Sequence, residues 1–186
     1  GDVYKRQDKM KIIQLDKKKI GKGYRPYIIA EMSGNHNQSL EKALEIVASA
    51  AATGADALKI QTYTPDTMTL NIKENEFFIN DKKGLWYGKS LYELYEIAHT
   101  PWDWHKPIMD KCKELGITFF STPFDSSSVD FLEGLGVPFY KIASFENCDL
   151  PLIKKVASTG KPIIISTGMA NISELDETVR ILRSEG

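Results

Sequence analysis

FYKIASFE, residues 139–146, is a short apolar run that closes on Lys141, Ser144 and Glu146. A lysine is rarely buried in a strand unless a counter-charge pairs with it or it serves a function. Four other stretches share this plan, an apolar run that ends in charged or hydroxyl residues: YIIAE (27–31), ALKIQT (57–62), ITFFSTPFD (117–125) and PIIISTGM (162–169). Each has the length and composition of a buried strand. We expect the polar ends of all five to meet around one anionic substrate.

Helical patterns lie between these strands. Leu44, Val47 and Ala51 recur at helical spacing, and Gly54 ends a helix predicted at residues 40–53. Further helices are predicted at residues 103–115 with Asp103 as N-cap, after Asp125, at residues 149–160 and from Ser173 onward. This alternation of strands and helices is typical of an α/β protein with a parallel sheet and helices outside it.

The sheet is predicted to form a barrel wall rather than a doubly wound sheet. No GxGxxG follows any of the strands, which removes the dinucleotide-binding fingerprint. Functional-looking residues end every strand instead of clustering at one switch point. A (β/α)8 barrel needs eight units and roughly 250 residues, whereas this chain has 186 residues and about five units. We therefore expect a (β/α)8 TIM barrel that is truncated after about five βα units, with a hairpin beginning at residues 11–15 that plugs one end.

This barrel part is predicted to span residues 10–186. GDVYKRQ, residues 1–7, has no periodicity, and Met10 is the expected start. Residues 1–9 are therefore expected to be a non-native or disordered leader.

Composition and charge exclude several classes of function. The formal net charge of -1 gives no reason to expect nucleic acid or an anionic membrane as partner. Cys112 and Cys148 lack metal-ligand spacing and are expected to be free thiols of a reducing compartment. No apolar run approaches the roughly 20 residues that span a bilayer. We expect a cytoplasmic protein.

Residues 63–100, called the excursion below, are too long for a plain connection, and long ordered segments are usually functional. Its aromatic residues either line a sugar pocket or pack over the barrel mouth: Phe77, Phe78, Trp86, Tyr87, Tyr92 and Tyr95. His36, in the loop SGNHNQ, is either a contact for substrate or metal or a hydrogen-bonding loop residue. His99 and His105 lack metal-ligand spacing and are predicted to be structural.

The strand ends carry the groups of an anion-binding site. Side chains alternate along a strand, so Lys59 and Gln61 share one face, and Lys141 points away from its apolar neighbours. Two lysines in one barrel interior are unfavourable unless a counter-charge, such as a bound phosphate or carboxylate, accompanies them. Hydroxyl donors are available at Thr122, Ser144, Ser166 and Thr167. Alternatively, Glu31 and Glu146 pair with the lysines as structural ions; otherwise they are candidates for acid–base catalysis or for binding substrate hydroxyls.

In these segments the sequence resembles the sialic acid synthase family, which are phosphoenolpyruvate-condensing synthases of nonulosonic acids. The resemblance is carried by IIAEMSGNHNQ, ADALKIQTYTPDT, ITFFSTPFD, VPFYKIASFE and GKPIIISTGMA. Several such motifs in the right order are far more specific than one alone. Within the family, QTYTPDTMTL and GLWYGKSLYELYEIAHTPWDWH resemble the pseudaminic acid synthase branch. N-acetylneuraminate and legionaminate synthases are the alternatives.

The resemblance implies a barrel followed by a small antifreeze-like C-terminal domain, and a domain-swapped homodimer. It implies a divalent metal, Mn²⁺ or Mg²⁺, whose histidine ligands lie beyond Gly186. In the implied reaction, the methylene carbon of phosphoenolpyruvate attacks the metal-polarised aldehyde of an open-chain acylamino sugar. Water adds at the phosphate-bearing carbon, and phosphate leaves by C–O cleavage. Without the remaining barrel and the C-terminal domain, the chain alone is expected to be inactive.

The motifs also imply a role for each candidate residue. Those that hold phosphoenolpyruvate are Lys59, Lys141, Thr122, Ser144 and Ser166. Glu31 assists proton transfer or the attacking water, Glu146 binds the sugar, and Gln61 supports the pocket, while His36 is a candidate substrate contact. Two other functions stay open: a class I aldolase with one of the two lysines as Schiff base, and a non-catalytic carbohydrate-binding fragment.

Overall fold

The structure, a computed structural model, describes residues 12–185; the predicted leader lies outside this range. Its central element is a parallel sheet of strands β3 (Ile29–Glu31), β4 (Ala57–Thr62), β5 (Thr118–Pro123), β6 (Tyr140–Ile142) and β7 (Ile163–Ile165). Each strand pairs with the next along the chain. This order is that of a barrel wall, because a doubly wound sheet reverses at a switch point. The expected part of a (β/α)8 barrel is confirmed.

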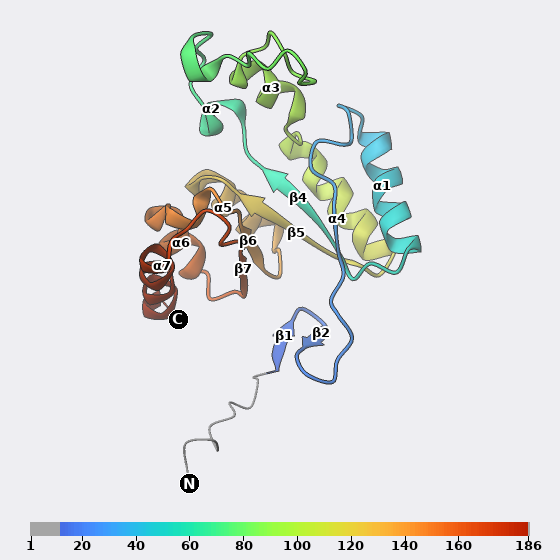
Figure 1. Ribbon diagram of the computed structural model, residues 1–186. Coiled ribbons are helices and arrows are strands. Elements are labelled where there is room, and N and C mark those ends of the chain that lie inside the picture. The colour runs from blue at the N-terminus through green and yellow to red at the C-terminus, as the bar shows by residue number, and fades with distance from the viewer. Residues whose placement is uncertain (1–11, 186) are drawn as a thin grey trace.

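Helices cover the outer face of this sheet (Figure 1). They are α1 (Leu40–Ala52), α4 (His105–Glu114), α5 (Ser126–Leu135), α6 (Leu150–Ala157) and α7 (Ile172–Glu185). Most strand side chains that face them are apolar, and Leu58, Ile60 and Ile142 among them are fully buried. Alternation along each strand turns the intervening residues to the inner face. None of the helices in residues 12–185 is long and apolar enough to cross a bilayer.

The excursion leaves the sheet at the carboxyl end of β4. It contains α2 (Pro65–Met68), the 3-10 helix η2 (Asn75–Phe77) and α3 (Leu91–Ala98), and it is followed by η3 (Trp102–Trp104). Ser90 Oγ accepts from the Glu93 N–H at 3.2 Å, and Glu93 Oε2 accepts from the Ser90 N–H at 2.9 Å, so a capping box begins α3. In Figure 1, α2 and α3 lie beyond the arrowhead of β4. The excursion therefore stands at the carboxyl end of the sheet.

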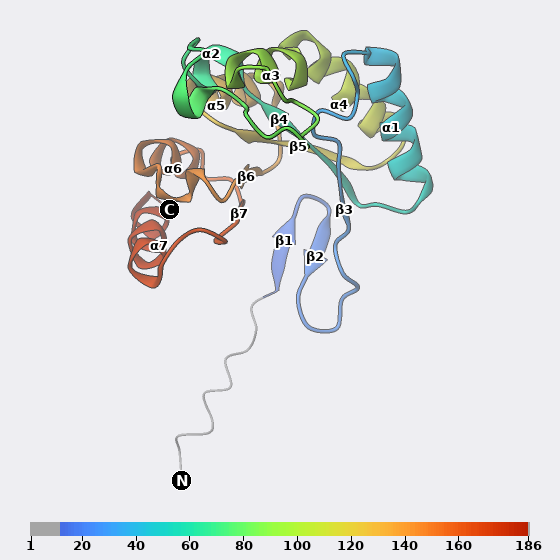
Figure 2. The same ribbon diagram turned by 45° about the horizontal axis from the view of Figure 1, so that its top comes forward.

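A second, smaller core fills the inner face near the amino ends of the strands. Ala57, Phe120 and Phe139 are fully buried there and pack with Leu15. Leu15 belongs to the antiparallel hairpin of β1 (Ile13–Leu15) and β2 (Lys18–Ile20). Figure 2 shows this hairpin on the side of the sheet opposite to α2 and α3. The hairpin predicted as a plug thus closes the amino end of the sheet.

Two predicted boundaries are wrong. The strand predicted at residues 139–146 ends at Ile142, because the backbone turns: the Glu146 N–H donates to the Ala143 carbonyl at 3.2 Å. Glu146 then begins the 3-10 helix η4 (Glu146–Cys148). The N-cap predicted at Asp103 is also wrong, because η3 runs directly into α4 and encloses Asp103 in a helical turn.

Candidate active site

Five of the predicted site residues lie on the inner face at the carboxyl ends of the strands. The parallel register places Glu31 opposite Lys59 and Gln61 opposite Thr122. Lys141 is the central residue of β6. All five alternate with side chains that pack on the helices, and parallel strands present their carboxyl ends at the same edge. The structure brings these side chains to one end of the sheet, while their roles stay predictions.

Lys59 forms an ion pair with Glu31 across the β3–β4 register. Its side chain is only 18% exposed, and burial together with the positive charge of Lys141 lowers its pKa to about 8. The structural pairing that the sequence left open is therefore present at Lys59. The pairing with Glu31 does not offset burial and like-charge repulsion, so a further anion close to Nζ would stabilise the charged form of this lysine.

Lys141 has no carboxylate partner within residues 12–185. Its Nζ donates to the Ile142 carbonyl at 2.6 Å and to Ser166 Oγ at 2.6 Å. Burial lowers the pKa of Lys141, and the negative charge of Glu146 only partly opposes this. The predicted alternative, a structural ion pair between Lys141 and Glu146, is absent. Two neutral acceptors hold a cation that an incoming phosphate or carboxylate can neutralise.

Glu146 is half-buried on the turn after β6, and its Oε2 is buried without a hydrogen-bond partner. Burial and the charge of Asp149 raise the pKa of Glu146, more than Lys141 lowers it. A buried polar atom without a partner is costly. A substrate hydroxyl would satisfy this oxygen, and the raised pKa suits a carboxyl group that exchanges a proton.

The predicted hydroxyl and amide residues lie at the strand ends and in the turns that follow them. Thr122 is buried at the end of β5, Ser144 is half-buried on the turn after β6, and Ser166 follows β7, where it accepts from Lys141. Gln61 Oε1 accepts from Ser33 Oγ at 3.4 Å.

Sequence reasoning missed two residues that support the site. Ser33 contacts Gln61 from the loop after β3. Asn147 is fully buried next to Glu146; its Nδ2 donates to the Ser166 carbonyl at 3.2 Å, and its own carbonyl accepts from Thr178 Oγ1 at 2.8 Å. Both lie in segments that follow a strand of the sheet, Ser33 in the loop after β3 and Asn147 in η4 after β6, which was the available signal.

His36 is fully buried, and both of its ring nitrogens are hydrogen-bonded. Nδ1 accepts from the Gln38 N–H at 3.2 Å, so Nε2 carries the proton that is donated to Thr100 Oγ1 at 3.2 Å. The ring packs edge-on against Trp104, with centroids 5.4 Å apart. This geometry supports the hydrogen-bonding role that the sequence left open and provides no free nitrogen for the predicted substrate contact.

The aromatic residues at the base of the excursion pack on one another. Tyr63 is buried and makes edge-to-face contacts with Tyr95 at 5.6 Å and with Phe124 at 5.4 Å between ring centroids. Tyr92 Oη donates to Asp66 at 2.9 Å. Tyr95 therefore packs against other aromatic residues, which is one of the two roles predicted for the excursion, whereas Tyr87, earlier in the excursion, is exposed.

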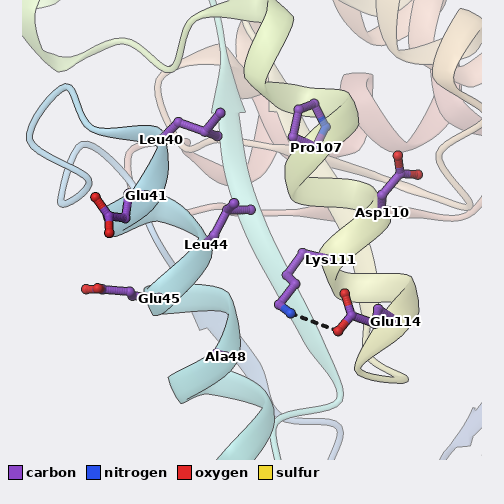
Figure 3. A pocket seen from close by; sticks show the side chains of 9 residues that line it. All are labelled: Leu40, Glu41, Leu44, Glu45, Ala48, Pro107, Asp110, Lys111 and Glu114. Carbon is purple, nitrogen blue, oxygen red and sulfur yellow. Dashed lines mark hydrogen bonds and ion pairs between the residues drawn. The ribbon is translucent and has the colours of Figure 1, made fainter.

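A groove of the surface lies elsewhere, on the outer wall between α1 and α4 (Figure 3). This groove of about 830 Å³ is lined by Leu40, Glu41, Leu44, Glu45, Ala48, Pro107, Asp110, Lys111 and Glu114. Lys111 and Glu114 form an ion pair within it. None of the predicted site residues lines this groove, so the candidate active site rests on the strand ends and not on cavity size.

The residues that the structure describes do not supply a metal site by themselves. Within residues 12–185 no group of three or more His, Cys, Asp or Glu side chains is placed to hold an ion. The two cysteines are free, with Cys112 buried and Cys148 exposed.

The NeuB family model matches residues 46–186 of this sequence. The chain belongs to the NeuB family. The pseudaminic acid synthase of Helicobacter pylori is 48% identical over 158 residues, which are 85% of this chain and 46% of that protein. The N,N'-diacetyllegionaminic acid synthase of Campylobacter jejuni is 35% identical over 160 residues, 86% of this chain and 47% of that protein.

Solved structures agree with this family membership. The N-acetylneuraminic acid synthetase of Leptospira borgpetersenii, in complex with citrate, superposes with a TM-score of 0.81 at 29% identity. The match covers 95% of this chain and 56% of that one. This NeuB-family chain spans about half the length of the curated relatives it matches.

Proposed function

We propose that the protein to which this chain belongs is a phosphoenolpyruvate-dependent synthase of a nonulosonic acid. Among these acids, the proposed product is pseudaminic acid. The observation that carries the proposal is the pair Lys59 and Lys141 on the inner face. Both are partly buried, each has a lowered pKa, and Lys141 lacks a carboxylate partner within residues 12–185. Such a pair suits a small ligand with a phosphate and a carboxylate. Phosphoenolpyruvate carries both groups on three carbons.

In the proposed first step, the methylene carbon of phosphoenolpyruvate attacks the aldehyde carbon of an open-chain acylamino sugar. A carbon–carbon bond forms, and the aldehyde oxygen takes up a proton to become a hydroxyl. The two lysines hold the phosphate and carboxylate, with hydroxyl groups of Thr122, Ser144 and Ser166 around them. Glu146 is the proposed partner of the sugar, since its buried Oε2 lacks a hydrogen-bond donor.

In the proposed second step, water adds at the carbon that bears the phosphate. Glu31 is the proposed acceptor of a water proton, because it lies half-exposed beside Lys59. The tetrahedral intermediate then collapses: the bond between carbon and the bridging oxygen breaks, phosphate leaves with that oxygen, and a keto group remains. Fixed cations stabilise the charge that develops on the leaving phosphate.

Sequence identity favours the pseudaminic acid branch. The chain is 48% identical to the Helicobacter pylori pseudaminic acid synthase and 35% identical to the Campylobacter jejuni legionaminic acid synthase over similar lengths. The proposed acceptor is therefore a 2,4-diacetamido-2,4,6-trideoxy sugar. Mn²⁺ or Mg²⁺ and a homodimer belong to the proposal for the whole protein, and no step above depends on a metal held by residues 12–185.

An isotope experiment on the full-length protein tests the proposal. Phosphoenolpyruvate with ¹⁸O in the bridging position is incubated with the 2,4-diacetamido sugar, and we expect the label in released phosphate. Lys141→Ala should lose both rate and phosphoenolpyruvate affinity. Lys155→Ala is the matched control, because this lysine pairs with Asp130 on the outer helices. Unchanged turnover in Lys141→Ala would refute the assignment, and a borohydride-trapped keto-acid adduct on either lysine would favour the aldolase instead.

A further inference from the structure

A buried network of hydrogen-bonded side chains links α4 to the ends of two strands, behind the candidate active site. Thr62 Oγ1 lies 2.8 Å from His105 Nε2 and 2.6 Å from Ser121 Oγ. All three residues are fully buried. The imidazole packs edge-on against Phe131 at 5.1 Å and Phe119 at 6.4 Å between centroids. Three polar groups are thus enclosed in an apolar layer, where each is satisfied by another of the three or by a backbone carbonyl.

The tautomer of His105 follows from one carbonyl. His105 Nδ1 lies 3.2 Å from the Pro101 carbonyl oxygen, which can only accept, so Nδ1 carries the proton. The neutral ring then has an acceptor at Nε2, and Thr62 donates to it. Since the single Thr62 hydrogen is committed, Ser121 donates to Thr62 Oγ1 at 2.6 Å and shares its one hydrogen with the Ile60 carbonyl at 3.1 Å. Burial, which lowers the pKa of His105 to about 4, keeps the ring neutral.

Thr62 and Ser121 are adjacent in sequence to two residues of the candidate active site. Thr62 follows Gln61 at the end of β4, and Ser121 precedes Thr122 in β5. Because side chains alternate, Gln61 and Thr122 face inward while Thr62 and Ser121 face α4. The outer pair and the inner pair therefore share the backbone at the ends of β4 and β5.

The turn at residues 101–105 holds the base of the excursion. The excursion starts at Tyr63, whose carbonyl accepts from Trp102 Nε1 at 3.2 Å. It returns at Pro101, whose carbonyl accepts from His105. Both ends of this long segment are therefore tied to the 101–105 turn.

We propose that His105, as the neutral Nδ1–H tautomer, is a positioning residue of the candidate active site. It orders the base of the excursion and aligns Gln61 and Thr122 through Thr62 and Ser121. This inference rests on the proposed function for its kinetic consequence, and on hydrogen-bond geometry for its structural one.

Variants at Thr62 separate the hydrogen bond from packing. Thr62→Val keeps the shape and removes the donor, while Thr62→Ser keeps the hydroxyl. In the full-length protein with phosphoenolpyruvate and the 2,4-diacetamido sugar, we expect Thr62→Val to lower kcat/KM for the sugar roughly ten- to hundredfold. Thr62→Ser should remain within about threefold of wild type. Equal kinetics for Thr62→Val and wild type, with both folded, would overturn the proposal.

Hydrogen exchange and ¹⁵N NMR test the geometry without relying on the reaction. We expect His105 to show the Nδ1–H pattern, and Thr62→Val to speed exchange in residues 63–70 and 98–104 while the core of β5 stays protected. An Nε2–H tautomer, or unchanged exchange at the base of the excursion, would overturn the inference. If wild type shows the expected NMR and exchange but releases no phosphate, the proposed function fails while the positioning role of His105 at this strand-end site stands.

Discussion

Lys59 and Lys141 lie on different strands of the sheet, yet burial and, after it, the positive charge of Lys141 lower the pKa of Lys59. The two side chains share the inner face, since each alternates with residues that pack on the outer helices. Only Lys59 has a carboxylate partner within the described part of the chain, and that partner is Glu31.

Removing the charge at residue 141 should raise the pKa of Lys59. We expect Lys141→Gln to shift it upward from about 8, because only the repulsive contribution disappears while burial remains. NMR titration of ¹³C-labelled lysine side chains measures this directly. Ser166→Ala is the control, since it removes a partner of Lys141 but keeps the charge. A lower or unchanged pKa in Lys141→Gln would show that the two ammonium groups do not interact.

Replacing Lys59 together with its partner Glu31 should stabilise the fold while impairing ligand binding. The charged form of this lysine is disfavoured by burial, and the double change leaves no unpaired carboxylate behind, so we expect Glu31→Gln/Lys59→Met to increase the free energy of unfolding by about 1 kcal/mol at pH 7. The same variant should lose affinity for phosphoenolpyruvate. Denaturant unfolding and calorimetric titration of the full-length protein give the two quantities. Destabilisation together with intact binding would contradict both expectations.

His105 should make stability depend on pH on the acid side. Its pKa falls from 6.5 to about 4 in the folded protein, mainly through burial, with His99 also lowering it and Asp103 opposing. The unfolded chain therefore binds more protons between these values, so stability is lost as pH falls from about 6.5 to 4. The maximum loss is about 3 kcal/mol.

A variant that lacks the His105 imidazole isolates this contribution to the pH dependence. His105→Gln removes the titration, and its free energy of unfolding should vary less with pH over this window than that of wild type. His99→Gln is the comparison at a half-buried ring whose Nδ1 contacts the Glu96 carbonyl, and it keeps the His105 titration. Identical pH slopes for wild type and His105→Gln would mean that the buried ring does not stay neutral.

Glu146 should act on the sugar more than on phosphoenolpyruvate. Because Oε2 lacks a partner, we expect Glu146→Gln to raise KM for the sugar about tenfold, with a smaller effect on KM for phosphoenolpyruvate. Steady-state kinetics with each substrate varied in turn provide the measurement. Asp149→Asn is a useful neighbour control, since Asp149 caps α6 instead. A larger effect on phosphoenolpyruvate would reassign Glu146 to that substrate.

Several features could be predicted from local sequence alone because they depend on local periodicity. The apolar runs at the strands, the helical spacing in α1 and the inward direction of Lys59 and Lys141 follow from repeats of two and 3.6 residues. The end of β6 could not be predicted in this way. It depends on the turn at Ala143, which places Ser144 and Glu146 outside the sheet.

What the sequence by itself determined is the α/β order, the family and the set of polar groups at the strand ends. Only the tertiary structure decided how those groups are paired: Glu31 with Lys59, Ser166 with Lys141, and Thr62 with His105. The residues of each pair are separated by at least one whole strand or helix. Their contact depends on register between strands and on burial, which no local pattern specifies.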